Sequence, residues 1–318
     1  MTRQLRPWIW LAIAIAVAAA LWFVPLFDVL GFEQALVVAG LASVAGLDLG
    51  ASHARALQII DPTRPVLERA DQPVRVLARG LAASIARTLV VVAVPLAAGA
   101  LHGLWVPTCD WTFGIHAYVL MPIASGVLGA ATGHLITVIV GTRTRASHLP
   151  HRSTWLAVVL PIVVLAGAGL VRFYGEPPVF TYDALIGYFP GNMYDENIVL
   201  GAPLVWSRIE QLAWVIALAC AVASRLDVPT YRVRLYAPRP QRAFGLAAAA
   251  VAFVAIAGLV RSDAGELGYA VDASDLQREL AGRYETPHFI IYYARTPEIE
   301  RDIALIAADH EFRYEQVV

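Results

Sequence analysis

The chain has 318 residues, of which 58% are hydrophobic and only 15% are charged. Its mean hydropathy of +0.61 exceeds what a soluble globular domain carries, so the composition argues against that class and favours an integral membrane protein. The formal net charge of −1 averages a basic set of loops with an acidic set, and it gives no sign of a nucleic-acid partner.

Seven runs of about twenty mostly apolar residues follow one another along the chain, and each is long enough to cross a hydrocarbon core about 30 Å thick. We predict spans at Trp8–Phe27, Phe32–Gly50, Leu81–Trp105, Phe113–Val140, Trp155–Val171, Leu204–Ser224 and Phe244–Val260. The predicted fold class is an all-α membrane protein, a bundle of about seven transmembrane helices. Residues 1–261 would form this membrane domain, and residues 262–318 a short α/β tail.

The basic residues predict the orientation of the bundle, because short arginine-rich loops stay in the cytoplasm. All 24 basic residues are arginines, and sixteen of them fall in or beside the N-terminus and alternate loops. The opposite loops hold three, Arg172, Arg208 and Arg261. We therefore expect a protein of the bacterial inner membrane, with a cytoplasmic N-terminus, an extracytoplasmic C-terminus and the lipid bilayer as its partner.

Two pairs of small residues one helical turn apart are compatible with close helix packing. They are Gly46 with Gly50 and Gly129 with Gly133. Alanine and glycine are so common in this chain that such pairs also arise by chance.

Two ionisable residues lie well inside predicted spans, His134 in the fourth and Glu210 in the sixth. An intramembrane ionisable group is a functional candidate by default. For His134 we weigh a hydrogen bond to a neighbouring helix against a proton-relay or ligand role. Glu210 would be satisfied near the outer interface, for example by an arginine from another span. A transporter would need several such groups near the midplane.

The loop after the fifth span, residues 172–196, combines tyrosines, phenylalanines, prolines and acids. Its prolines predict turns, and its aromatic rings suit a membrane interface. We weigh an interfacial loop that covers the span ends against a surface for a ligand or partner. The candidate residues of that surface, together with a neighbouring outer loop, are Cys109, Asp110, Tyr174, Glu176, Asp183, Tyr188, Tyr194, Asp195 and Glu196.

The tail is predicted to form a helix, a strand and a second helix. Asp272–Tyr284 is typical of a helix, with Ser274 or Asp272 as its cap, and His288–Tyr293 is a run typical of a buried strand. Thr296 is the expected N-cap of the last helix, with Pro297 in its first turn. One unpaired strand leaves Phe289 and Ile303 without a closed core. We therefore expect the chain to end inside a larger domain.

The strand Thr286–Tyr293 and the helix ending Asp309–Val318 resemble the opening of peptidase MA-like domains, which are zinc metallopeptidases of the gluzincin group. The loop from Arg172 to Glu196 is similar to one in bacterial multi-span proteins that carry such a domain. The resemblance implies a zinc-dependent extracytoplasmic peptidase. Tyr314 stands where the second histidine of the zinc motif would follow His310, so no zinc ligand is assigned within these residues. Any zinc would belong to a part of the domain beyond them.

Three functions remain open. The first is a membrane anchor, with a possible sensing role, for an extracytoplasmic zinc metallopeptidase. The second is a small-molecule transporter or channel. The third is a non-enzymatic sensor or scaffold that binds a partner through the loop 172–196. Polar groups that face a common cavity would favour transport, whereas a sealed bundle with a structured cap favours an anchor or a sensor. The identity of the substrate or protein partner does not follow from the sequence.

Overall fold

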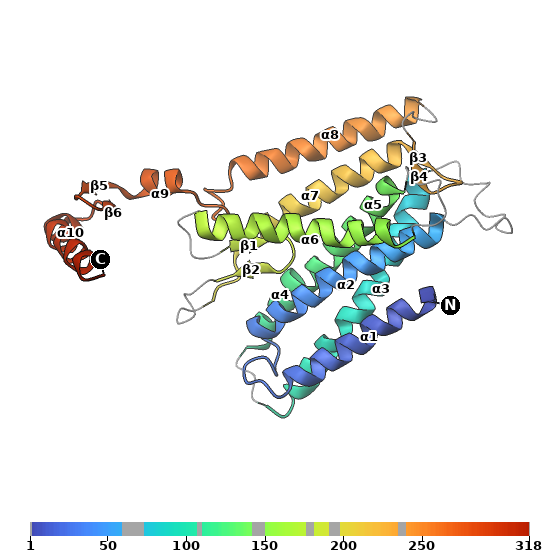
Figure 1. The fold of residues 1–318 in the computed structure, drawn as a ribbon, viewed down its shortest axis with the longest axis horizontal. Helices are drawn as coiled ribbons and strands as arrows, with labels where there is room; N and C mark the ends of the chain where they lie inside the picture. Colours follow the sequence, from blue (N-terminus) through green and yellow to red (C-terminus); the bar gives the residue numbers. More distant parts are fainter. Residues whose placement is uncertain are drawn as a thin grey trace.

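The protein is mostly helical in a computed structural model that describes residues 2–58, 73–106, 110–141, 150–175, 181–190, 198–234 and 240–317 (Figure 1). Its helices are α1 (Thr2–Leu21), α2 (Phe32–Gln58), α3 (Pro73–His102), α4 (Trp111–Tyr118), the π-helical turn η1 (Val119–Ile123), α5 (Ala124–Val140), α6 (Pro150–Gly175), α7 (Ala202–Ser224), α8 (Pro240–Ser262), α9 (Ala273–Leu280) and α10 (Pro297–Val317). Its strands are β1 (Thr181–Asp183), β2 (Gly187–Phe189), β3 (Leu226–Asp227), β4 (Arg232–Val233), β5 (Ala281–Glu285) and β6 (Ile290–Ala294).

Within the described residues, six helices are long and apolar enough to cross a membrane. They cover Phe32–Gln58, Pro73–His102, Trp111–Val140, Trp155–Arg172, Ala202–Ser224 and Ala243–Ser262. The first expected span, residues 8–27, corresponds to α1, which stops earlier, at Leu21, and has a shorter apolar part, Leu5–Leu21. The structure therefore gives an all-α membrane fold with six candidate spans and a few short strands.

The centre of the bundle is a seam where α2 and α5 approach backbone to backbone. A Cβ atom added to Gly46 would lie 2.7 Å from the Gly126 carbonyl oxygen, and one added to Gly129 would lie 2.6 Å from the Ser43 carbonyl oxygen. At Gly50 and Gly133 an added Cβ would meet the carbonyl oxygens of Ala130 and Leu47 at even closer range. Both predicted glycine pairs thus lie in one interface, where no larger residue fits.

The other long helices pack around this seam, some against α2 and α5 directly and one at the edge of the bundle. α1 and α3 pack on one side of it, and α1 is tied to α2 where Arg6 and the indole N–H of Trp10 bind Asp48, the latter at 2.9 Å. α6 packs on α2 and α5, whereas α8 lies along α7 at the edge of the bundle (Figure 1). Most side chains of α6 and α8 are exposed, as expected of helices that face lipid.

A π-helical turn interrupts the helix predicted at Phe113–Val140. Pro122 lies inside η1 and has no backbone N–H to donate, so the regular ladder of hydrogen bonds cannot pass through it. Leu120 lies in this turn, and its carbonyl group accepts a hydrogen bond from Arg208 on α7, at 2.9 Å. Such π-bulges occur frequently at functional sites.

The tail differs from its predicted arrangement. The helix expected at Asp272–Tyr284 ends at Leu280, because Ala281 takes a left-handed conformation (φ 56°) and starts β5. β5 pairs antiparallel with β6, so the strand predicted to be unpaired has a partner, with Gly282 opposite Tyr293. The capping predictions hold: Asp272 caps α9, and Thr296 accepts from the Ile299 N–H at 3.3 Å.

Candidate functional site

The loop after α6 enters the bundle as a β-hairpin. β1 and β2 pair with Tyr182 opposite Tyr188 and Asp183 opposite Gly187, which leaves residues 184–186 as the turn. The Asp183 carboxylate shapes this turn by accepting from the Leu185 N–H at 2.7 Å and the Ile186 N–H at 3.2 Å. At its tip the Leu185 carbonyl accepts a hydrogen bond from Ser43, in the middle of α2.

Arg208 on α7 holds the hairpin against the bundle. Its side chain is buried, with 7% exposed, and its guanidinium group donates to the carbonyl oxygens of Leu120 (2.9 Å) and Ala184 (3.2 Å). It also donates to Gln211 Oε1 (2.7 Å) and Ser125 Oγ (2.6 Å). A guanidinium group is the side chain best suited to join several acceptors at once.

Gly187 allows the hairpin to come this close to Arg208. Its φ of 99° favours glycine, and an added Cβ would lie 2.8 Å from Arg208 Nη2. Asp183 lies close enough to act on Arg208 electrostatically, so a carboxylate balances part of the buried charge. Arg208 therefore connects the π-turn, the hairpin and α7 in one polar cluster.

A second polar cluster surrounds His134 toward the other end of the bundle. His134 is fully buried on α5, its Nδ1 lies 2.9 Å from Ser84 Oγ on α3, and its Nε2 lies 2.8 Å from the Tyr231 hydroxyl. Tyr231 reaches in from the β3–β4 connection with a left-handed backbone (φ 51°), and burial raises its pKa. Gly80 leaves room for the hydroxyl group, because an added Cβ would overlap it.

Both ring nitrogen atoms of His134 have a hydrogen-bond partner. The Ser84 hydroxyl also lies 3.1 Å from the Gly80 carbonyl oxygen, and the donor and acceptor roles at the two ring nitrogen atoms follow from the imidazole tautomer. In either tautomer, a neutral ring is satisfied by Ser84 on one side and Tyr231 on the other. His134 thus makes interhelical hydrogen bonds.

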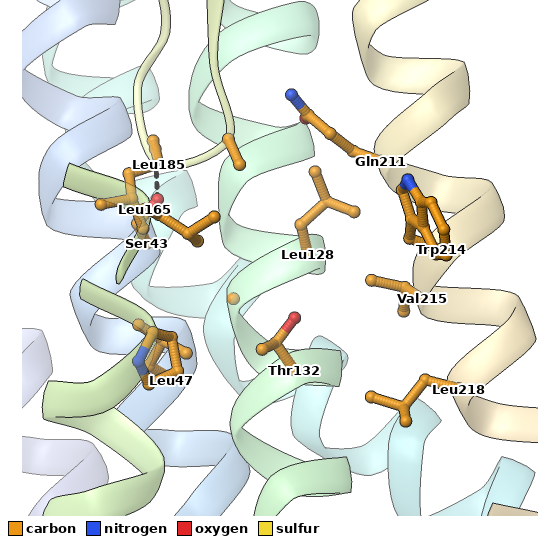
Figure 2. A pocket seen from close by; sticks show the side chains of 13 residues that line it. Ser43, Leu47, Leu128, Thr132, Leu165, Leu185, Gln211, Trp214, Val215 and Leu218 are labelled. Atoms are coloured by element: carbon orange, nitrogen blue, oxygen red, sulfur yellow. Dashed lines mark hydrogen bonds between the residues drawn. The ribbon is translucent and has the colours of Figure 1, made fainter. Parts of the chain in front are cut away.

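A cavity of about 300 Å³ lies between α6 and α7 (Figure 2). Its lining residues are Ser43, Leu47, Leu128, Gly129, Thr132, Pro161, Leu165, Ala184, Leu185, Gln211, Trp214, Val215 and Leu218. The floor belongs to α2 and α5, and the hairpin tip closes one end. The walls are mostly hydrocarbon, and neither His134 nor Arg208 lines the cavity.

The structure separates the residues predicted for the outer surface. Asp183 and Tyr188 lie on the inserted hairpin, where burial raises the pKa of Tyr182 to about 12 with a smaller contribution from Tyr188. Tyr174 is an exposed residue at the end of α6, which continues to Gly175, past the predicted start of the loop at Arg172.

Asp110 is the exposed N-cap of α4, and hydrogen bonds from Thr112 and Phe113 lower the pKa of its carboxyl group. Cys109, Glu176, Tyr194, Asp195 and Glu196 lie outside the described residues.

Glu210 faces away from Arg208, as expected from a separation of two helical residues. It accepts from the Trp214 indole N–H at 3.4 Å. The Tyr269 hydroxyl group, which donates to the Val260 carbonyl at 2.8 Å, lies near Glu210, and burial and then Glu210 raise the pKa of Tyr269. Arg261 and Arg172 act on the same hydroxyl group. Polar groups from α6, α7, α8 and the start of the tail therefore meet at this end of the bundle.

Arg208, Ser43 and Tyr231 are the important residues that sequence reasoning missed. From the sequence, Arg208 is counted with the outer loops, although Ser207, Arg208 and Gln211 form a polar stripe at helical spacing inside α7. That stripe is a signal for a buried partner. Ser43 and Tyr231 have no comparable signal, because their partners come from distant parts of the chain.

The described residues contain no group of three or more His, Cys, Asp or Glu side chains that could hold a metal ion. Comparison of the chain with protein-family models, with curated proteins and with solved structures found no match.

Proposed function

We propose that residues 1–261 are a membrane anchor, with a sensing capacity, that presents an extracytoplasmic C-terminal segment. One observation carries this proposal: within the described residues, the buried His134 and Arg208 side chains bind other protein groups, and neither of them lines the cavity between α6 and α7. A transporter would place such groups around a common substrate pathway. A bundle whose two most deeply buried ionisable groups are bound to protein partners, with a hairpin packed into it, fits an anchor or a sensor better.

The anchor would have seven spans, with α1 as the first. Its twenty residues extend about 30 Å at 1.5 Å per residue, which is enough to cross a hydrocarbon core. α1 also runs along most of α2: Arg6 binds Asp48, and Leu21 packs with Leu30 and Val38 near the other end of that helix. These contacts support counting α1 as a membrane-crossing helix.

The N-terminus would be cytoplasmic and the tail extracytoplasmic, in the inner membrane of a bacterium. The arginine asymmetry supports this orientation. In Figure 1 the N-terminus lies at the same end of the bundle as the arginine-bearing β3–β4 connection, and the tail lies at the other end with the β1–β2 hairpin.

Alkaline phosphatase fusions test the proposed topology, because this enzyme is active only outside the cytoplasm. Fusions after Pro107, Asn192 and Asp263 are expected to be active, and fusions after Pro73, Ser147 and Pro238 inactive. Activity after Pro73 would contradict the topology.

The peptidase part of the proposal concerns the tail. It requires a zinc site completed by residues that follow the helix α10 in the full gene product. We expect a His-Glu-x-x-His helix within about one domain length, of the order of 100–150 residues. If the reading frame lacks it, the peptidase function is excluded and a sensor or scaffold becomes the leading function.

A further inference from the structure

The cavity between α6 and α7 extends from the bundle interior to the lipid-facing surface. Its floor residues Leu47 and Leu128 are buried, with 1% and 8% exposed, whereas Trp214 in its wall is 46% exposed. Trp214 belongs to α7, and Pro161 and Leu165 in the facing wall belong to α6. The cavity therefore opens beside an exposed apolar side chain, between two helices that are candidate membrane spans.

The polar groups in the cavity wall are mostly engaged elsewhere. The Ser43 hydroxyl donates to the hairpin, and the Gln211 amide accepts from Arg208 and donates to Ser207 Oγ at 3.1 Å. The Thr132 hydroxyl is directed into the cavity (Figure 2). A polar solute or an ion would thus meet a wall of leucine, valine and proline with little to bind it.

We propose that this cavity binds one acyl chain of a membrane phospholipid. The inference rests on the proposed membrane placement, which surrounds the mouth with hydrocarbon chains. Inside a bilayer no hydrophobic force separates protein from lipid, so affinity comes from van der Waals contact in a cavity of matching shape. A volume of about 300 Å³ is in the range of small ligand sites.

The bound chain would touch the inserted hairpin. Ala184 and Leu185 form the end of the cavity, and their carbonyl groups are the ones held by Arg208 and Ser43. An acyl chain in the cavity would therefore pack against the hairpin tip. This contact gives the bundle a physical route by which lipid could affect the hairpin end, which is the end that carries the tail.

Photo-crosslinking with a phosphatidylcholine that carries a diazirine in its acyl chain tests the proposal. The full chain is reconstituted in vesicles of that lipid, irradiated, digested and analysed by mass spectrometry. We expect crosslinks on α2 and α5 at the buried floor, around Leu47 and Leu128, in addition to crosslinks on the exposed faces of α6 and α8. Bulk lipid reaches those exposed faces but not the floor.

Val215→Phe should fill the cavity and lower floor labelling roughly tenfold. The matched control is Val163→Phe, which enlarges an exposed side chain on the outside of α6 and should leave floor labelling unchanged. Labels on the exposed faces only, or equal floor labelling in Val215→Phe and wild type, would overturn the proposal. The wild-type experiment decides the question even if Val215→Phe does not fold. Absence of labels on all faces would instead contradict the membrane placement.

Discussion

The membrane bundle and the C-terminal tail bury their side chains to different extents. In the bundle, Arg208 and His134 are at most 7% exposed and make hydrogen bonds between helices that are distant in sequence. In the described part of the tail, α10 buries only Ile303 and Ala307, and α9 has no buried residue.

The two regions also differ in what holds them together. The bundle has the close backbone contact between α2 and α5 and the two buried polar clusters around His134 and Arg208. Its structure therefore depends on many contacts between residues distant in sequence. The described part of the tail is held by the β5–β6 pairing, by the contact between Glu311 and His288, by a capping box at Asp272 and by exposed ion pairs such as Arg313–Asp309. Exposed pairs of this kind contribute about 0–1 kcal/mol each. The tail also leaves apolar residues such as Leu305 and Phe312 exposed, although it would lie outside the hydrocarbon core that faces the exposed apolar side chains of the bundle.

The largest expected loss of stability comes from adding a methyl group to a glycine at the contact between α2 and α5. Gly50→Ala places a Cβ on the Ala130 carbonyl oxygen, so α2 and α5 must separate, and we expect a loss of about 3 kcal/mol or more. Gly167→Ala is the matched control, because nothing lies within 4 Å of its added Cβ on α6. It should be neutral or stabilising by up to about 1 kcal/mol. Thermal unfolding in detergent measures both, and equal stability of the two variants would disprove the seam.

The next effect comes from removing the charge that holds the hairpin. Arg208→Met leaves the Leu120 and Ala184 carbonyl groups without their donor, and we expect a loss of about 3 kcal/mol. The Leu185 and Ile186 amide protons should then exchange faster, because the turn is no longer held in the bundle. The control Arg261→Met changes an exposed arginine at the end of α8 and should leave that exchange unchanged. Unchanged exchange in Arg208→Met would show that the hairpin does not depend on this residue.

Local signals in the sequence predicted much of this structure. Long apolar runs predicted seven spans, and six of them correspond to helices long and apolar enough to cross a membrane. Capping residues predicted the starts of α9 and α10, because such signals depend on neighbours in the chain. The Gly46/Gly50 and Gly129/Gly133 pairs indicated close packing. Their sequence spacing did not show that α2 and α5 face each other, since this choice depends on the whole bundle.

The inserted hairpin and the start of β5 could not be predicted in the same way. Residues 181–189 have the composition of an interfacial loop, and their place inside the bundle depends on Ser43 and Arg208, which lie far away in sequence. At Ala281, a left-handed backbone ends a helix that its local propensity would continue. Such tertiary choices override local preferences.

The smallest effect concerns the tail alone and comes from its most perturbed carboxylate. Glu311 on α10 accepts from the His288 N–H at 2.9 Å and lies 2.7 Å from His288 Nδ1, so it joins α10 to the β5–β6 turn. Hydrogen bonds from Thr286 and then His288 lower the pKa of Glu311 from 4.5 to about 2. Because the pKa is lower in the folded state, the contribution of Glu311 to stability is fully present above pH 4.5. It is lost as the pH falls toward 2.

Acidification should therefore loosen α10 from the β5–β6 hairpin between about pH 4.5 and 2, through loss of the Glu311–His288 contact. The chemical shift of the His288 amide in detergent-solubilised protein measures this step. Glu311→Gln keeps a hydrogen-bond acceptor but does not titrate, so its amide shift should not show the step. Glu315→Gln, on an exposed position of the same helix, should keep it. If Glu311→Gln keeps the same transition, another group controls the docking of α10. If Glu311→Gln changes the amide shifts of the α2–α5 seam relative to wild type at the same pH, the bundle and the tail are coupled, and the contrast between them fails.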